Sequence, residues 1–260
     1  MYDLPWLHMA NDDLWRVVAA CLTANGIEDV PTFLTRNVDL HALWRSPDLL
    51  LAQTCGYPLV RELEGHAVLL ATPHYIAEGC EGPYHRSAIL VRADDPAADI
   101  ADLKGRRAGM NDRRSNSGMN LLRDAVAPYA DGATFFASVQ VTGSHADSLM
   151  ALLTGAIDVA AIDCITLAHL RSRYPQQAAQ LRVLAWTRAV PGLPLILSMT
   201  QAHHREQLLM ALRHASIDPM GQASLHTLRI GGFSALSWDD YAIIRTIEQQ
   251  AIESGYPVLQ

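Results

Sequence analysis

The sequence of 260 residues contains a single lysine, Lys104, so nearly every basic side chain is an arginine. The Gly-Lys-Ser/Thr combination of a nucleotide-binding phosphate loop is absent, and catalysis through a lysine Schiff base is nearly excluded. Acidic residues outnumber basic ones, which gives a formal net charge of −7. The basic residues form no long run: Arg113 and Arg114 are adjacent, and another short group is Lys104-Gly105-Arg106-Arg107. This balance argues against a nucleic-acid partner.

Long apolar stretches are also missing, since no run approaches the roughly 20 residues that a membrane-spanning helix needs. The chain begins Met1-Tyr2-Asp3-Leu4-Pro5, without the basic segment or apolar core of a signal peptide. We therefore expect no direct membrane span. The expected location is periplasmic or extracytoplasmic if a signal peptide was trimmed, and cytoplasmic if Met1 is the true start.

Cysteine is scarce, and its spacing fits no metal motif. The four cysteines show neither a C-x-x-C pair nor a zinc pattern, and the histidines form no H-E-x-x-H motif. We expect no metal and no cofactor. Cys55 and Cys80 lie in polar, glycine-containing loops, where they either remain free or pair in an oxidising compartment.

Short apolar runs alternate with helical patterns along most of the chain, which predicts an α/β protein with largely parallel, buried strands. The strands are expected near residues 49–53, 67–71, 87–92, 107–110, 135–141, 157–162, 181–186 and 195–199. Ligands of such folds lie in the loops at the carboxyl ends of the strands. The polar loops after residues 53, 71, 110, 141 and 162 are therefore the candidate walls of a site.

The segment 115–118, Ser-Asn-Ser-Gly, opens a predicted helix that begins near Gly118. A helix start presents backbone N–H groups that suit phosphate, phosphonate, sulfate or carboxylate. The candidate anion-binding residues are Ser115, Asn116, Ser117 and Gly118. The alternative is ordinary helix capping by Ser115 or Ser117.

Other polar residues in strand-end loops are candidates for the same site. His145 opens a predicted helix and either donates to an anion or only begins that helix. Asp163 ends a very apolar strand, where it either binds a ligand amine or hydroxyl or caps the next helix. Tyr57 and Tyr84 lie in Gly/Pro-containing loops and suit a small-molecule cleft as well as plain loop packing.

An enzyme is a second interpretation of the same residues. Cys164 beside His145 and Asp163 could form a nucleophilic set, although cysteines at the ends of buried strands are usually inert. A Gly-x-Ser-x-Gly nucleophile elbow is absent, because no glycine precedes the 115–118 segment at the required place.

Three blocks, in their order and spacing, resemble the phosphate- and phosphonate-type substrate-binding proteins of ABC transporters. They are Asn111-Asp112-x-x-Ser115-x-Ser117-Gly118, Thr142-Gly143-Ser144-His145-x-x-Ser148, and Ile157-Asp158-Val159-Ala160-Ala161-Ile162-Asp163. The resemblance implies a two-lobed type II periplasmic-binding-protein fold, with a mainly parallel sheet in each lobe and a cleft between the lobes. Lobe 1 would comprise residues 1–91 plus 192–260, and lobe 2 residues 92–191.

The resemblance also implies roles for individual residues. Residues 115–118 would hold an oxyanion, His145 would add a donor, and Asp163 would face the far end of the ligand. Tyr57 and Tyr84 would close the cleft from lobe 1, with Tyr2 as a further candidate. Arg86 near the cleft would favour a more anionic ligand than a zwitterionic aminophosphonate.

The sequence also departs from the family pattern. The family's usual first strand, before Tyr2, is missing, and the loops of Cys55 and Cys80 are not general family features; we expect a disulfide between these two cysteines at the cleft rim of lobe 1. The expected function is that of a monomeric, non-enzymatic receptor that binds a small oxyanion, phosphate or a phosphonate, for an ABC permease. The alternatives are a small-molecule synthase or transferase on the same fold, or a ligand-sensing regulatory domain.

Overall fold

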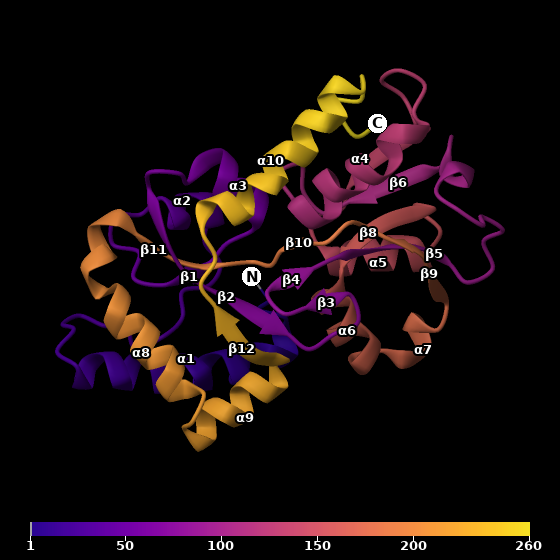
Figure 1. The fold of residues 1–260 in the computed structure, drawn as a ribbon. Helices are drawn as coiled ribbons and strands as arrows, with labels where there is room; N and C mark the ends of the chain where they lie inside the picture. The colour runs from indigo at the N-terminus through magenta and orange to yellow at the C-terminus, as the bar shows by residue number, and fades with distance from the viewer. Residues whose placement is uncertain (1) are drawn as a thin grey trace.

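The computed structural model describes residues 2–260, which form two large sheets joined by a small one (Figure 1). We call the part of the chain around the four-stranded sheet lobe 1 and the part around the five-stranded sheet lobe 2. The lobe 1 sheet has the order β1-β11-β2-β12. Its strands are β1 (Ala52–Gln53), β2 (Ala67–Tyr75), β11 (Leu195–Ser198) and β12 (Ile230–Ser234).

Helices cover both faces of the lobe 1 sheet. They are η1 (Pro5–Leu7), α1 (His8–Ala24), α2 (Leu40–Trp44), α3 (Gly56–Glu62), η5 (Met199–His204), α8 (Arg205–Ala215), α9 (Pro219–Thr227) and α10 (Trp238–Glu253). Successive side chains of β11 point to opposite faces, as in any strand. Leu197 packs in a core with α1 and α8, whereas Ile196 packs in a core with α3 and α10. The strand is apolar on both faces because both faces are covered.

Lobe 2 has a five-stranded sheet of order β7-β6-β8-β5-β9. Its strands are β5 (Ser87–Arg92), β6 (Arg107–Met110), β7 (Ser138–Val141), β8 (Val159–Asp163) and β9 (Leu181–Trp186). Its helices are η2 (Ala101–Leu103), η3 (Asn116–Asn120), α4 (Leu121–Val126), η4 (Ala127–Tyr129), α5 (His145–Leu153), α6 (Cys164–Arg173) and α7 (Pro175–Ala178). Val159 and Ala161 of β8 pack in the core that holds α4, and Ala160 and Ile162 pack in the core that holds α5 and α6.

The chain crosses between the lobes at a small sheet of order β10-β4-β3. Its strands are β3 (Cys80–Glu81), β4 (Tyr84–His85) and β10 (Val190–Pro191). The C-terminal segment makes a third connection, because α10 leaves lobe 1 and the chain end reaches α4 (Figure 1). There the Gln260 carbonyl accepts hydrogen bonds from the backbone N–H groups of Phe135 and Phe136, at 2.8 and 3.1 Å.

The expected α/β fold is confirmed, but the strand directions are more mixed than expected. In lobe 2, β6 runs parallel to β7 and β8, while β5 runs antiparallel to β8 and β9. Every strand pair of the lobe 1 sheet is antiparallel, so the expected mainly parallel sheet is wrong there. The crossings explain this: β2 carries the chain toward the crossing and β11 carries it away, so the two neighbours must run in opposite directions.

The expected lobe boundaries also differ from the strand pairing. Residues up to 91 were expected in lobe 1, yet β5 pairs with β8 and β9 of the lobe 2 sheet. The first crossing therefore lies at β4, before Ser87, rather than near residues 91–95. Within residues 2–260 no strand precedes β1. No helix among these residues is both long and apolar enough to cross a membrane.

Candidate functional site

The Ser-Asn-Ser-Gly segment begins a helical stretch, as expected from the sequence. Ser115 is the N-cap of η3, and its Oγ accepts a hydrogen bond from the Gly118 backbone N–H at 3.0 Å. Helix α4 continues directly from η3. Gly118 has no room for a side chain, because an added Cβ would lie 1.9 Å from Asn111 Oδ1 and 3.1 Å from the His145 ring. The backbone of the helix start is therefore pressed against Asn111 and His145.

Ser117 of η3, His145 at the start of α5 and Asp163 at the end of β8 meet in lobe 2. The distance from Ser117 Oγ to His145 Nε2 is 2.8 Å, and His145 Nε2 lies 3.4 Å from Asp163 Oδ2. All three side chains are largely buried. Burial lowers the pKa of His145, and the Asp163 carboxylate opposes this only in part. His145 is therefore a neutral imidazole at neutral pH, a hydrogen-bonding group rather than a fixed cation.

Asp163 uses its two oxygens for different purposes. Oδ1 caps helix α6 and accepts hydrogen bonds from the backbone N–H groups of Ile165 and Thr166, at 3.1 and 2.9 Å. Oδ2 faces His145. The two interpretations of Asp163, as a cap and as a group that faces the site, therefore both describe it. The cap fixes the direction in which the second oxygen points.

Lobe 1 contributes aromatic groups on the other side of Asp163. The hydroxyl of Tyr2 is buried without a hydrogen-bond partner, and its ring meets Tyr75 edge-on, with the ring centroids 5.0 Å apart. Burial raises the pKa of Tyr2 well above its ordinary value, and the nearby Asp163 carboxylate adds to the rise. An unpartnered buried hydroxyl is costly unless a ligand or water completes it. Tyr2 thus lies near Asp163, and its role toward a ligand stays a prediction.

The sequence of the chain matches a known protein family. Residues 46–241 match the family described as ABC transporter, phosphonate, periplasmic substrate-binding protein. The chain belongs to this family. Its members are transport receptors rather than enzymes, so the enzymatic interpretation is set aside. No curated protein matches the sequence of this binding protein.

Solved structures share the fold of this binding protein at low sequence identity. PhnD1 from Prochlorococcus marinus, in complex with methylphosphonate, aligns with a TM-score of 0.75 and 14% identity over 94% of each chain. A binding-protein component of an ABC phosphonate transporter from Pseudomonas aeruginosa aligns with a TM-score of 0.73 and 19% identity, over 95% of this chain and 83% of that one. XAC2383 from Xanthomonas citri, bound to ATP, has a TM-score of 0.71 and 17% identity over 95% of each chain. They establish a type II periplasmic-binding-protein fold.

Several residues expected at the cleft of the binding protein are engaged elsewhere. The Tyr57 hydroxyl donates to the Glu248 carboxylate of α10. Tyr84 lies on β4 in the small sheet, with 38% of its surface exposed. The Arg86 guanidinium donates to the Thr187 carbonyl at 2.8 Å and joins the two crossing segments. This hydrogen bond to a neutral carbonyl leaves the guanidinium charged, so the expected effect of Arg86 on the ligand stays a prediction.

The cysteines do not form the expected pair. All four are free thiols in this structure. The Sγ atom of Cys55 accepts a hydrogen bond from the Asn116 backbone N–H at 3.4 Å, so Cys55 supports the helix start. Cys80 instead contacts Cys164, with the two Sγ atoms 3.2 Å apart. Cys164 is buried, and its hydrogen bond with Cys80 together with burial raises its pKa, which removes the basis for the nucleophilic set.

The sequence analysis missed other groups beside the site. Asn111 Oδ1 and His85 Nδ1 are both buried without a hydrogen-bond partner. Asn111 stood in the quoted motif but was given no role, although its place directly after β6 is a strand-end position. Tyr75 was missed because the strand expected to end at residue 71 continues to residue 75. Among the described residues, no group of three or more His, Cys, Asp or Glu side chains is arranged to hold a metal ion.

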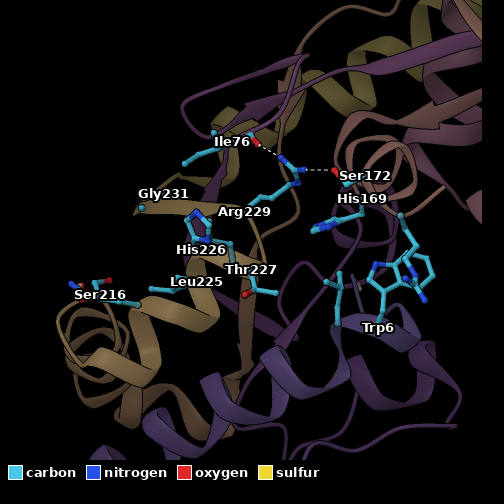
Figure 2. A pocket seen from close by; sticks show the side chains of 15 residues that line it. Trp6, Ile76, His169, Ser172, Ser216, Leu225, His226, Thr227, Arg229 and Gly231 are labelled. Atoms are coloured by element: carbon cyan, nitrogen blue, oxygen red, sulfur yellow. Dashed lines mark hydrogen bonds between the residues drawn. The ribbon is translucent and has the colours of Figure 1, made fainter. Parts of the chain in front are cut away.

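A cavity of about 780 Å³ lies beside this region and is lined from both lobes (Figure 2). Arg229 reaches across it from lobe 1, and its guanidinium donates to Ser172 Oγ of α6 at 2.7 Å. His169, also on α6, and Trp6 line the same cavity. The residues of α6 that line this cavity come after the Asp163 cap along the helix. Helix α6 therefore borders both the cavity and the place where Ser117, His145 and Asp163 meet.

His85 is expected to make the stability of the binding protein depend on pH. Burial lowers the pKa of His85 from its ordinary 6.5 to about 4. The unfolded chain therefore binds a proton below pH 6.5 that the folded chain does not. The contribution of neutral His85 to the free energy of unfolding is complete above pH 6.5 and is lost as pH falls toward 4. Between pH 7 and pH 5 we expect a loss of about 2 kcal/mol from this residue.

Urea denaturation of wild type and His85→Phe at both pH values measures this effect. Phenylalanine keeps a ring of similar size and cannot titrate, so the variant should lose less stability between pH 7 and pH 5. Equal losses in the two proteins would show that His85 does not carry the pH dependence.

Proposed function

We propose that this protein binds a small phosphorus oxyanion, phosphate or a phosphonate, and presents it to an ABC permease on the periplasmic side of a membrane. The observation that carries the proposal is the meeting of Ser117, His145 and Asp163, which come from three different elements, η3, α5 and β8. Ser115, Asn116 and Gly118 complete the helix start. Hydroxyls and backbone N–H groups at such a start can hold a phosphorus oxyanion without a charged partner. The N–H groups of Asn116 and Gly118 would have to exchange their present partners, Cys55 Sγ and Ser115 Oγ, for the ligand.

The Asp163 carboxylate narrows the kind of ligand. The other two groups that meet there, Ser117 and His145, are neutral, so a fully deprotonated anion would be repelled by Asp163. A ligand with its own hydrogen donor, such as a P–OH group or an ammonium group, removes this conflict by donating to Asp163. The buried hydroxyl of Tyr2 provides a second partner at that end. Monoprotonated phosphate, monoprotonated phosphonates and aminophosphonates meet this requirement, whereas sulfate at neutral pH does not.

Thermal unfolding of the ligand-stripped protein tests this function. Phosphate, methylphosphonate, 2-aminoethylphosphonate and sulfate are each added at a concentration well above the micromolar range. A ligand at about 100 times its Kd stabilises the folded state by about 2.7 kcal/mol, which raises Tm by roughly 5–10 °C for a chain of this size. We expect such a rise with at least one phosphorus compound and none with sulfate. A Tm that responds to none of the phosphorus compounds would overturn the proposal.

A further inference from the structure

Cys80 and Cys164 meet at the junction between the lobes. Cys80 lies on β3, just before the first crossing, and Cys164 is the first residue of α6 in lobe 2. Their Sγ atoms are 3.2 Å apart. The backbone fixes this approach from both sides, because Cys80 pairs with His85 across the β3–β4 hairpin and the Cys164 N–H donates to the Arg86 carbonyl at 3.1 Å.

The residues just before Cys80 also allow the β3–β4 hairpin to lie close to α6. Gly79 has φ +91°, and an added Cβ would lie 3.0 Å from the Cys164 Cβ and 2.7 Å from the Trp186 ring. Only glycine satisfies both conditions, since other residues rarely adopt this φ and none fits the space. One residue earlier, the Glu78 carboxylate pairs with Arg171 of α6 at 2.9 Å. Two independent contacts thus join the same two segments.

We propose that Cys80 and Cys164 form a reversible disulfide that ties the β3–β4 hairpin to α6 and holds the cleft between the lobes closed. Cys164 directly follows Asp163, so the link would lie next to the candidate site. Cys80 is held by His85 and Cys164 by Arg86, the two residues between which the chain leaves β4 for lobe 2, so a rotation of the lobes at this junction would separate the two sulfurs. A covalent bond between them opposes that movement.

The two thiols are suited to different steps of disulfide formation. Cys80 is half-buried, and its hydrogen bond with Cys164 lowers its pKa, whereas Cys164 is buried and its pKa is raised. Cys80 is therefore the thiolate that meets an external oxidant first. With a small disulfide such as oxidised glutathione, the Cys80 thiolate attacks one sulfur, and one glutathione thiolate leaves as the S–S bond breaks.

The second step completes the exchange. Cys164 gives up its proton and attacks Cys80 Sγ in the mixed disulfide, which forms the Cys80–Cys164 bond and releases the second glutathione thiolate. Two protein thiols lose two electrons and two protons in total, and one glutathione disulfide becomes two glutathione thiols. A dithiol reductant reverses both steps.

Peptide mapping tests whether Cys80 and Cys164 pair, and it needs no ligand. Wild type and the variants Cys80→Ser, Cys164→Ser and Cys21→Ser are equilibrated with oxidised glutathione, alkylated and digested without reduction. We expect a Cys80–Cys164 cross-linked peptide in wild type and in Cys21→Ser, lost after dithiothreitol, and absent from the other two variants. A cross-link of Cys80 to Cys55, or persistent free thiols at 80 and 164, would overturn the site.

The effect of the disulfide on the cleft is tested separately from the pairing of the two cysteines. Only one of the two measurements of this effect rests on the proposed function. In small-angle scattering of ligand-free protein, oxidised wild type should have a smaller radius of gyration than reduced wild type. Release of methylphosphonate should be at least 10-fold slower after oxidation, with no change in Cys80→Ser. If the cross-link formed but changed neither the radius of gyration nor the release rate, the proposal that it holds the cleft closed would be overturned. If oxidation reduced the radius of gyration but methylphosphonate did not bind, only the proposed ligand would be contradicted.

Discussion

Asp163→Asn is expected to remove the preference for phosphate over sulfate. Asparagine keeps an Oδ1 that caps α6, so the helix start at Ile165 and Thr166 should be preserved. The change removes the negative charge next to His145. A protonated ligand loses a charge-assisted hydrogen bond of about 1.5–3 kcal/mol, which is roughly a 10- to 100-fold loss of affinity. Sulfate should gain at the same time, because the carboxylate that repelled it is gone.

Calorimetric titration of both variants with both anions measures this change. Asp158→Asn is the matched control, because Asp158 directly precedes the same strand and pairs with Arg107 at the opposite end, where its Oδ1 lies 2.7 Å from the guanidinium. The control should keep the phosphate-to-sulfate ratio of wild type while losing some stability. A ratio that stays at the wild-type value in Asp163→Asn would show that Asp163 does not contact the ligand.

The double variant Ser117→Ala, His145→Ala should bind methylphosphonate at least about 100-fold more weakly than wild type. Each substitution removes one hydrogen-bond donor from the helix start, and each such bond to a charged ligand contributes about 1.5–3 kcal/mol. The variant should still fold, since Ser115 rather than Ser117 caps the helix and His145 only begins α5. The loss should therefore appear in Kd and not in the circular dichroism spectrum.

Ser138→Ala provides the control for this variant. Ser138 is an exposed serine of β7 in the same lobe, so its hydroxyl can be removed without touching the site. Its Kd should equal that of wild type. If the double variant also kept the wild-type Kd, the oxyanion would have to bind somewhere other than the helix start.

The sequence indicated which segments of lobe 2 meet because of the local sheet order. β6 lies between β7 and β8 and runs parallel to both, so the loops that follow these three strands leave the same edge of the sheet. The rule that ligands lie at the carboxyl ends of parallel strands therefore applies there. It brought together Ser117, His145 and Asp163, which are separated by tens of residues in the chain.

Lobe 1 could not be predicted in the same way. Its strands are antiparallel, so consecutive strand ends leave opposite edges and a strand-end loop need not face the cleft. Tyr57 shows the consequence, because its hydroxyl partner, Glu248, lies 191 residues further along the chain. Nothing near Tyr57 in the sequence indicates that contact. The expected Cys55–Cys80 pair failed for a similar reason, since similar loop composition carries no information about distance.

Arg86 illustrates a further limit of sequence patterns. An arginine next to a candidate cleft suggests a cation for an anionic ligand, and its position on the chain was correctly placed near the crossing. Its guanidinium is instead held by the Thr187 carbonyl of the second crossing segment. That contact spans 101 residues and depends on the two crossings lying side by side. The sequence alone therefore could not show that Arg86 joins the two crossing segments.

Isothermal titration calorimetry of the ligand-stripped wild-type protein with methylphosphonate tests the central claim most directly. We expect one site per chain with a Kd in the micromolar range or tighter, about −8 kcal/mol or more favourable. A titration that yields no heat of binding up to millimolar methylphosphonate, phosphate or 2-aminoethylphosphonate would contradict a phosphorus-oxyanion site at Ser117, His145 and Asp163.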